Sequence, residues 1–189
     1  MELREVTKVL PTQQLRERYS DLTHRLTGEK PVTSSQVRDF YTNLERQNET
    51  DPDPAALEAI EFHRSFYDIN LNPQDLARIE CYSDLSPNHP SYYLTDGGKD
   101  KSLLHVAKRF IENDVPNNME PWKLENVRDM IKQLKAGQSF PAIILSERPK
   151  GMRPDGKIHV IDGVHRLLAL AVHQLQNPDS SMSQSAYIA

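Results

Sequence analysis

The chain has 189 residues, of which 23 are lysine or arginine and 27 are aspartate or glutamate, so its formal net charge is −4. This length suits one ordinary domain or a small domain with an extension, and the negative balance gives no global field that would collect nucleic acid or anionic membrane. The single cysteine, Cys81, excludes an intramolecular disulfide and a cysteine-based zinc site.

The chain shows no targeting or membrane signal. Its first residues, MELREVTKVLPTQQ, mix charged with isolated apolar side chains and lack the apolar core of a signal peptide, and no later segment approaches about 18 consecutive apolar residues. With a lone cysteine that fits a reducing compartment, these features predict a soluble, cytoplasmic protein with no membrane partner.

Residues 1–85 are predicted to be mainly helical. Apolar residues recur at helical spacing within 11–28, 33–48, 51–68 and 72–85, each stretch having a plausible first turn or cap. The second stretch begins with serine and threonine residues that suit an N-cap, and it places Val37, Phe40, Tyr41 and Leu44 on one face. We expect Cys81, in the fourth, to be a small buried residue.

Residues 86–100, SPNHPSYYLTDGGKD, interrupt this pattern with two prolines and paired glycines. Such a tract predicts a boundary or a functional loop. A short helix is expected after it, in KSLLHVAKRFIEND. The sequence therefore suggests a helical region over 1–85, a linker loop and helix over 86–118, and a separate module over 119–189.

The last third of the chain alternates helices with strands. The predicted elements are a helix in LENVRDMIKQLKAG closed by Gly137, strands in FPAIILSE and KIHVID, a helix from about His165 to Leu175, and a final strand in AYIA at the edge of the sheet. The predicted fold class is α+β, a helical N-terminal region followed by a small α/β module with a short mixed sheet.

The second strand of this module leads directly into a polar corner, DGVHR. Gly163 permits a sharp turn and a close approach of another group, and the helix after it exposes amide N–H groups where the helix dipole favours an anion. His165 and Arg166 add donors that suit phosphate or carboxylate oxygens. Asp162 is suited to cap the helix, hold Arg166, ligate Mg²⁺ or act as a base.

Spacing alone leaves two other interpretations of the corner open. In the first, Asp162 is only an N-cap and Arg166 only its surface partner, because charged residues are common near strand–glycine–helix corners. In the second, His159, Asp162 and His165 form a zinc site. These three residues straddle a strand-to-helix turn, and nothing in their spacing makes them converge.

The segment from about Trp122 to Ala189 resembles the ParB/sulfiredoxin superfamily. Members of that family show a helix, a P-x-x-V strand, a second strand and a DG-x-HR-x-x-A corner; here these elements stand as LENVRDMIKQLKAG, FPAIIL and KIHVIDGVHRLLALA, followed by YIA. The resemblance implies that ATP or another nucleotide binds at the corner, with its phosphates on Gly163, Val164, His165 and Arg166. Lys123 lies near the position where relatives present a basic residue to the nucleotide.

The corner is most similar to the DGHHR version of the motif, found in free-serine-kinase-like members that phosphorylate an amino acid. The resemblance therefore implies a Mg²⁺-dependent phosphotransferase or nucleotide hydrolase, with Asp162 near the metal and Asp162 or His165 assisting proton transfer. The partners would be a nucleotide and an acceptor chosen by the helical region.

Two differences from known members of the family narrow the functions that this resemblance implies. Sulfiredoxins have their reactive cysteine where this chain has Val164, which excludes sulfinic-acid repair. Partition-type ParB proteins continue into a helix-turn-helix, whereas fourteen residues follow Leu175 here, so nucleic acid is not the expected partner. Two alternatives stay open: a non-catalytic nucleotide or anion sensor that controls a protein partner, and a ParB-like nuclease or DNA-associated regulator, which the charge balance disfavours.

Overall fold

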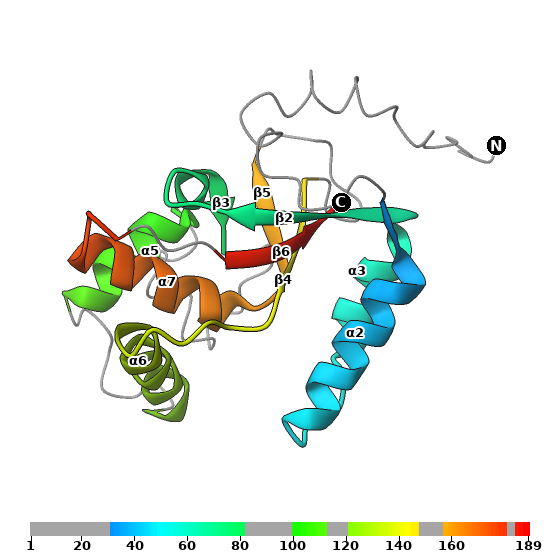
Figure 1. The fold of residues 1–189 in the computed structure, drawn as a ribbon, viewed down its shortest axis with the longest axis horizontal. Helices are drawn as coiled ribbons and strands as arrows, with labels where there is room; N and C mark the ends of the chain where they lie inside the picture. The colour runs from blue at the N-terminus through cyan, green and yellow to red at the C-terminus, as the bar shows by residue number, and fades with distance from the viewer. Residues whose placement is uncertain (1–30, 82–99, 113–120, 148–156, 181–183) are drawn as a thin grey trace.

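Six strands form one mixed sheet at the centre of the described structure (Figure 1). The computed structural model describes residues 31–81, 100–112, 121–147, 157–180 and 184–189, without the side chains of 121–124. The strand order is β1-β2-β6-β4-β5-β3. The strands are β1 Val32–Thr33, β2 Ser65–Leu71, β3 Ile79–Glu80, β4 Ile143–Ser146, β5 Ile158–Asp162 and β6 Gln184–Ile188.

Helices lie on both sides of this sheet. The helices of the described ranges are α2 Ser34–Gln47, α3 Pro54–Phe62, the 3₁₀ helix η2 Asp75–Arg78, α5 Leu103–Ile111, α6 Pro121–Lys135 and α7 Val164–Gln176. Figure 1 shows α5, α6 and α7 on one side and α2 and α3 on the other. The predicted α+β class is confirmed. Within the described ranges no helix has the length and apolar character needed to cross a membrane.

Helix α2 forms where its sequence predicts. The Thr33 side chain accepts from the N–H of Gln36, and the Gln36 side chain accepts from the N–H of Thr33, which makes a capping box. Val37, Tyr41 and Leu44 are buried along one face. The helix predicted within 11–28 lies outside the described residues.

The helix predicted over 51–68 is right only in its first part. Helix α3 begins after the N-cap Asp53 and ends at Phe62, and the chain then enters β2. Strand β2 pairs antiparallel with β6 and places Phe66, Ile69 and Leu71 in buried positions. Pairing with β6 therefore outweighs the helical spacing of these apolar residues.

The helix predicted over 72–85 is wrong for its described part. The Asn72 side chain accepts from the N–H groups of Gln74 and Asp75, and the Asp75 side chain accepts from the N–H of Asn72, so these residues close a tight turn before η2. Ile79 then pairs in parallel with Ile158 of β5. Long-range strand pairing, which local periodicity does not reveal, determines the secondary structure of this segment.

The last strand, β6, occupies the middle of the sheet, so the expectation of an edge strand is wrong. It pairs antiparallel with β2 and parallel with β4. Gln184, Ala186 and Ile188 are buried and alternate with the half-buried Ser185 and Tyr187, so neither face of this strand is open to solvent. The sheet therefore combines strands from both sides of the boundary that the sequence suggested.

Two hydrophobic clusters hold the helices to the sheet. The larger cluster packs α5, α6 and α7 against one side, and it includes Cys81, which is buried as expected. The smaller cluster packs α2 and α3 against the other side through Phe66 and Ile144. The C-terminal end of β5 and the start of α7 lie between these two groups of helices (Figure 1).

Candidate functional site

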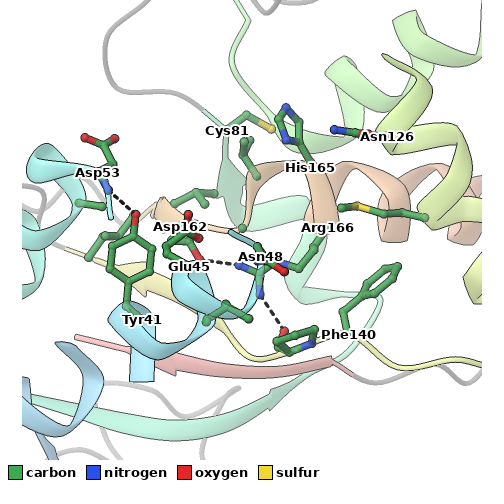
Figure 2. A pocket seen from close by; sticks show the side chains of 18 of the residues that line it. Tyr41, Glu45, Asn48, Asp53, Cys81, Asn126, Phe140, Asp162, His165 and Arg166 are labelled. Atoms are coloured by element: carbon green, nitrogen blue, oxygen red, sulfur yellow. Dashed lines mark hydrogen bonds and ion pairs between the residues drawn. The ribbon is translucent and has the colours of Figure 1, made fainter. Parts of the chain in front are cut away.

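A cleft of about 760 Å³ opens where β5 meets α7. Its floor is the corner Asp162–Arg166, one wall comes from α2 and the N-cap of α3, and the other comes from α6 and the segment that enters β4. Figure 2 shows Tyr41 and Asp53 on one side of the corner and Asn126 and Phe140 on the other. The structure therefore places the DGVHR motif at the bottom of a cleft between two different walls.

Gly163 makes the corner possible for two reasons. Its φ of 95° and ψ of 23° lie in the left-handed region, where residues with a Cβ are strained. A Cβ at this position would also lie 3.0 Å from Nη2 of Arg166 and 3.1 Å from Cγ1 of Ile143. The glycine therefore serves the packing of Arg166 as well as the turn of the chain.

Helix α7 begins at the floor of the cleft without a side-chain cap. The carbonyl of Gly163 accepts the N–H of Leu167 at 3.0 Å, which starts the helical ladder. The first-turn N–H groups of Val164, His165 and Arg166 precede that ladder and belong to residues that line the cleft. This is the arrangement expected for an anion site at a helix N-terminus.

Arg166 is bonded within the protein. Its Nη1 donates to the carbonyls of Pro141 at 3.1 Å and Ala142 at 2.9 Å, and its Nη2 donates to Oδ2 of Asp162 at 2.5 Å. Arg166 is 9% exposed and Asp162 is half-buried, so the pair is largely shielded from solvent and is not the surface pair considered from the sequence. These contacts join the start of α7 to the segment that enters β4.

Asp162 lies in a poorly solvated position. Burial raises the pKa of its carboxyl above the usual range, and the neighbouring Arg166 guanidinium opposes that rise without cancelling it. The negative charge of Glu45 on α2 acts in the same direction as burial. Residues far apart in the sequence thus share one electrostatic environment.

The described residues do not by themselves form a magnesium site at Asp162, so the Mg²⁺ implied by the resemblance stays a prediction. The carboxylate that would ligate the ion is paired with Arg166. Across the described ranges, no group of three or more histidine, cysteine, aspartate or glutamate side chains is placed to hold a metal ion. The zinc alternative fails for the same reason, and His159 is buried on β5 beside Glu80, with 3.9 Å between its Nδ1 and Oε2 of Glu80.

The other residues predicted for the site differ in whether their side chains line the cleft. His165 is half-buried and lines the cleft, and Figure 2 shows it near Asn126 and Cys81. Val164 lines the cleft and also packs against the larger hydrophobic cluster. Lys123 belongs to the first turn of α6, but its side chain is outside the described part of the structure.

The wall formed by α2 and α3 was missed by sequence reasoning. Its cleft-lining polar residues include Tyr41, Glu45 and Asp53. The Tyr41 hydroxyl accepts the N–H of Asp53 at 3.0 Å, and Glu45 accepts from Oγ1 of Thr50 at 2.6 Å. Burial, helped by the nearby carboxylates, raises the pKa of Tyr41 to about 12. No local signal marks this wall, because α2 is an ordinary amphipathic helix in sequence.

The wall formed by α6 is less charged than the α2–α3 wall. Asn126, Met130 and Gln133 line it from one stripe of the helix, and Phe140 and Pro141 continue it toward β4. The carboxylate among its described lining residues, that of Asp129, is 2.8 Å from Nζ of Lys132. The cleft thus has an acidic end and an apolar, amide-bearing end.

Comparisons with protein families, curated proteins and solved structures found no match to this chain. The resemblance to the ParB/sulfiredoxin superfamily therefore stays a prediction that rests on the motif and the order of its flanking elements. The chemistry of the cleft is the remaining basis for assigning a function.

Proposed function

We propose that this chain is a nucleotide-binding phosphotransferase whose ligand lies in the cleft with its phosphates on the first turn of α7. The observation that carries the proposal is the left-handed Gly163 followed by an uncapped helix start at the floor of a 760 Å³ cleft. Small-molecule and cofactor pockets typically have volumes of about 300–1,000 Å³. The predicted motif and this geometry point to the same class of ligand.

The phosphate contacts in this proposal come mainly from the backbone. The N–H groups of Val164, His165 and Arg166 and the positive end of the α7 dipole favour a negatively charged group. Arg166 acts indirectly, because its bonds to Pro141 and Ala142 fix the helix start against the sheet. The His165 side chain, which lines the cleft, is suited to donate to a phosphate oxygen.

The acidic wall is assigned to the acceptor. Glu45 and Asp162 lie at this end of the cleft, close enough that the charge of Glu45 affects the titration of Asp162. A carboxylate is suited to take the proton of an acceptor hydroxyl during phosphoryl transfer. Asp162 is occupied by Arg166, so Glu45 is the better placed of the two for this role.

Thermal shift with ATP, ADP, CTP and GTP, each with and without Mg²⁺, tests whether a nucleotide binds. At least one nucleotide is expected to raise the melting temperature, because a ligand that binds only the folded state stabilises it. The substitution His165→Asp places a carboxylate in the first turn of α7, where it suits the helix dipole but repels phosphate. It should therefore remove the shift while the protein stays folded.

Ser35→Asp is the matched control for this experiment. It puts the same charge in the first turn of α2, at an exposed position outside the cleft lining. The nucleotide shift should survive in this variant. A shift that survives equally in His165→Asp, or no shift with any nucleotide in the wild type, contradicts a phosphate site at α7.

A non-catalytic nucleotide sensor is a second candidate, favoured by the internal bonding of Arg166. A ligand at α7 would bear directly on the pair that joins this helix to Asp162 and to the segment entering β4. Release of nucleoside diphosphate separates the two candidates. A phosphotransferase should lose at least tenfold in turnover in Glu45→Gln with nucleotide affinity kept, whereas a sensor binds nucleotide and releases no product.

A further inference from the structure

The segment that enters β4 lies just outside the reach of the backbone pairing between β4 and β6. That pairing sets Ile143 opposite Ala186. The same parallel register, carried back two residues, sets Pro141 beside Gln184. Proline has no N–H, so it cannot donate to a backbone ladder at this point. Phe140 and Pro141 line the cleft, so whatever holds this segment also shapes the wall of the cleft.

The Gln184 side chain supplies bonds to this segment. Gln184 is 5% exposed, and its Nε2 donates to the carbonyls of Phe140 at 3.3 Å and Pro141 at 3.0 Å. The same nitrogen donates to the carbonyl of Ser185 at 3.0 Å. Because the amide is buried, these carbonyls and not bulk water are the partners of its N–H groups. Gln184 thus continues the attachment of β4 to β6 by a side chain, where the backbone cannot.

The Pro141 carbonyl joins this amide to the floor of the cleft. It accepts from Nη1 of Arg166 as well as from Gln184. Arg166 in turn donates to the carboxylate of Asp162, and Figure 2 shows it between Asp162 and Phe140. A row of hydrogen bonds therefore runs from the middle of the sheet to the start of α7, although Gln184 is not among the described residues that line the cleft.

We infer that Gln184 is a positioning residue for the phosphate site at the start of α7, and that it acts through Pro141 and Arg166. This inference rests on the proposed function, because it concerns how firmly the first N–H groups of α7 are held where the phosphate binds. Donors bind an anion best when their geometry is fixed before the anion arrives. Without the Gln184 amide, Pro141 is held less firmly, and the Arg166 guanidinium loses a fixed partner.

The substitution Gln184→Glu turns this role into a pH dependence. An ionised carboxyl has no proton to donate to the facing carbonyls, whereas a protonated carboxyl regains one O–H donor. Burial beside those carbonyls should raise the pKa of the new carboxyl, so that it is ionised at about pH 8 and protonated at about pH 5. Calorimetric titration with inorganic tripolyphosphate, and in parallel with ATP, should show about 10-fold weaker binding than the wild type at pH 8 and about equal binding at pH 5.

This measurement distinguishes a positioning role from a merely structural one. A residue that only stabilises the fold would lower the melting temperature and leave the affinity of the folded protein unchanged at both pH values. Comparison with the wild type at the same pH cancels the titration of the phosphate groups themselves. Gln184→Met guards against a variant that does not fold, because it keeps the length of the side chain without a donor or a charge. It should bind tripolyphosphate about 10-fold more weakly at both pH values.

Gln174→Glu is the matched control. Gln174 lies on α7, and its Nε2 also donates to backbone carbonyls, those of Pro178 at 2.9 Å and Asn177 at 3.5 Å. It is not among the described residues that line the cleft. The substitution therefore adds the same charge and breaks the same kind of bond without touching the segment that enters β4. Its affinity for tripolyphosphate should match that of the wild type at both pH values.

The outcomes separate this inference from the function on which it rests. If neither tripolyphosphate nor ATP binds the wild type, the proposed function is overturned and the positioning role with it. If the wild type binds and Gln184→Glu binds equally well at pH 8, or Gln174→Glu loses as much affinity, the positioning role alone is overturned. A loss in Gln184→Glu that does not recover at pH 5 also overturns it, because the site then does not depend on the donor.

Discussion

The two sides of the sheet differ in how firmly their helices are held. Among the described residues, the cluster beneath α5, α6 and α7 contains 23 buried residues and the cluster beneath α2 and α3 contains six, so opening the described part of the α2–α3 side exposes far less apolar surface. A contact between α2 and α3, the pair Arg38–Glu61, is exposed and adds little. We therefore expect α2 and α3 to open locally before the rest of the sheet unfolds.

This difference matters because the cleft lies between the two sides. The DGVHR corner and Phe140 belong to the firmly packed side, and Glu45 belongs to the weakly packed one. We therefore expect the floor of the cleft and its α6 wall to stay fixed while the α2–α3 wall moves. Three substitutions, from the largest expected effect to the smallest, test this contrast.

Arg166→Met should cause the largest loss. It leaves the poorly solvated Asp162 carboxylate without its charge partner and frees the carbonyls of Pro141 and Ala142, so the free energy of unfolding should fall by about 4 kcal/mol. Urea denaturation measures this value. Arg38→Met, which breaks an exposed pair on the weakly packed side, should cost less than about 1 kcal/mol. Similar losses of unfolding free energy in both variants would contradict the expected difference between the two sides of the sheet.

Gly163→Ala should come next, at about 3 kcal/mol. The left-handed backbone strains an alanine, and the new Cβ would lie 3.0 Å from Nη2 of Arg166, so the guanidinium must shift and its hydrogen bonds weaken. Gly137→Ala separates these two causes, because Gly137 has a φ of 76° and a Cβ added there would have nothing within 4 Å. It should cost only about 1 kcal/mol. An equal cost at both glycines would mean that the contact with Arg166 contributes nothing.

Tyr41→Phe should have the smallest effect, about 1 kcal/mol, and a local one. It leaves the N–H of Asp53 without the hydroxyl that joins α2 to the start of α3. Hydrogen exchange should become faster at amides of α2 and α3 and stay unchanged in α7. Equal acceleration in α7 would show that the two sides of the sheet unfold as one unit.

The Tyr41→Phe substitution should also change how the stability of the protein depends on pH. Because the pKa of Tyr41 is raised to about 12, the folded protein keeps this proton between about pH 10 and pH 12, where the unfolded chain releases it. Stability of the wild type should therefore fall as pH rises through this window. Urea midpoints at pH 8 and pH 11 should show a larger drop for the wild type than for Tyr41→Phe. Tyr67 and Tyr187 remain in both proteins and cancel.

The parts of the fold that the sequence predicts are those decided by local chemistry. The capping box at Thr33 and Gln36 and the apolar stripe of α2 lie within one segment, and so does the turn at Gly163. Strands β2 and β3 were missed because their partners, β6 and β5, lie far downstream in the chain. Tertiary pairing, not propensity, makes these residues strands.

The candidate site, like the fold, could be predicted only where residues close in sequence decide it. The DGVHR corner was found because its glycine, histidine and arginine are adjacent in sequence, and the pairing of Asp162 with Arg166 is a four-residue contact that the sequence already suggested. The approach of Glu45 to Asp162 joins segments separated by most of the chain. No spacing rule connects them, so the acidic wall emerges only once α2 is packed on the sheet.

The central position of β6 also sets an order of events during synthesis. Strands β2 and β4 are both made before β6, yet each pairs with β6 and they are not neighbours of one another. Until residues 184–188 leave the ribosome, the two halves of the sheet have no strand between them, and the walls of the cleft have no fixed spacing. The chain thus cannot complete this cleft until nearly all of the described residues are free to fold.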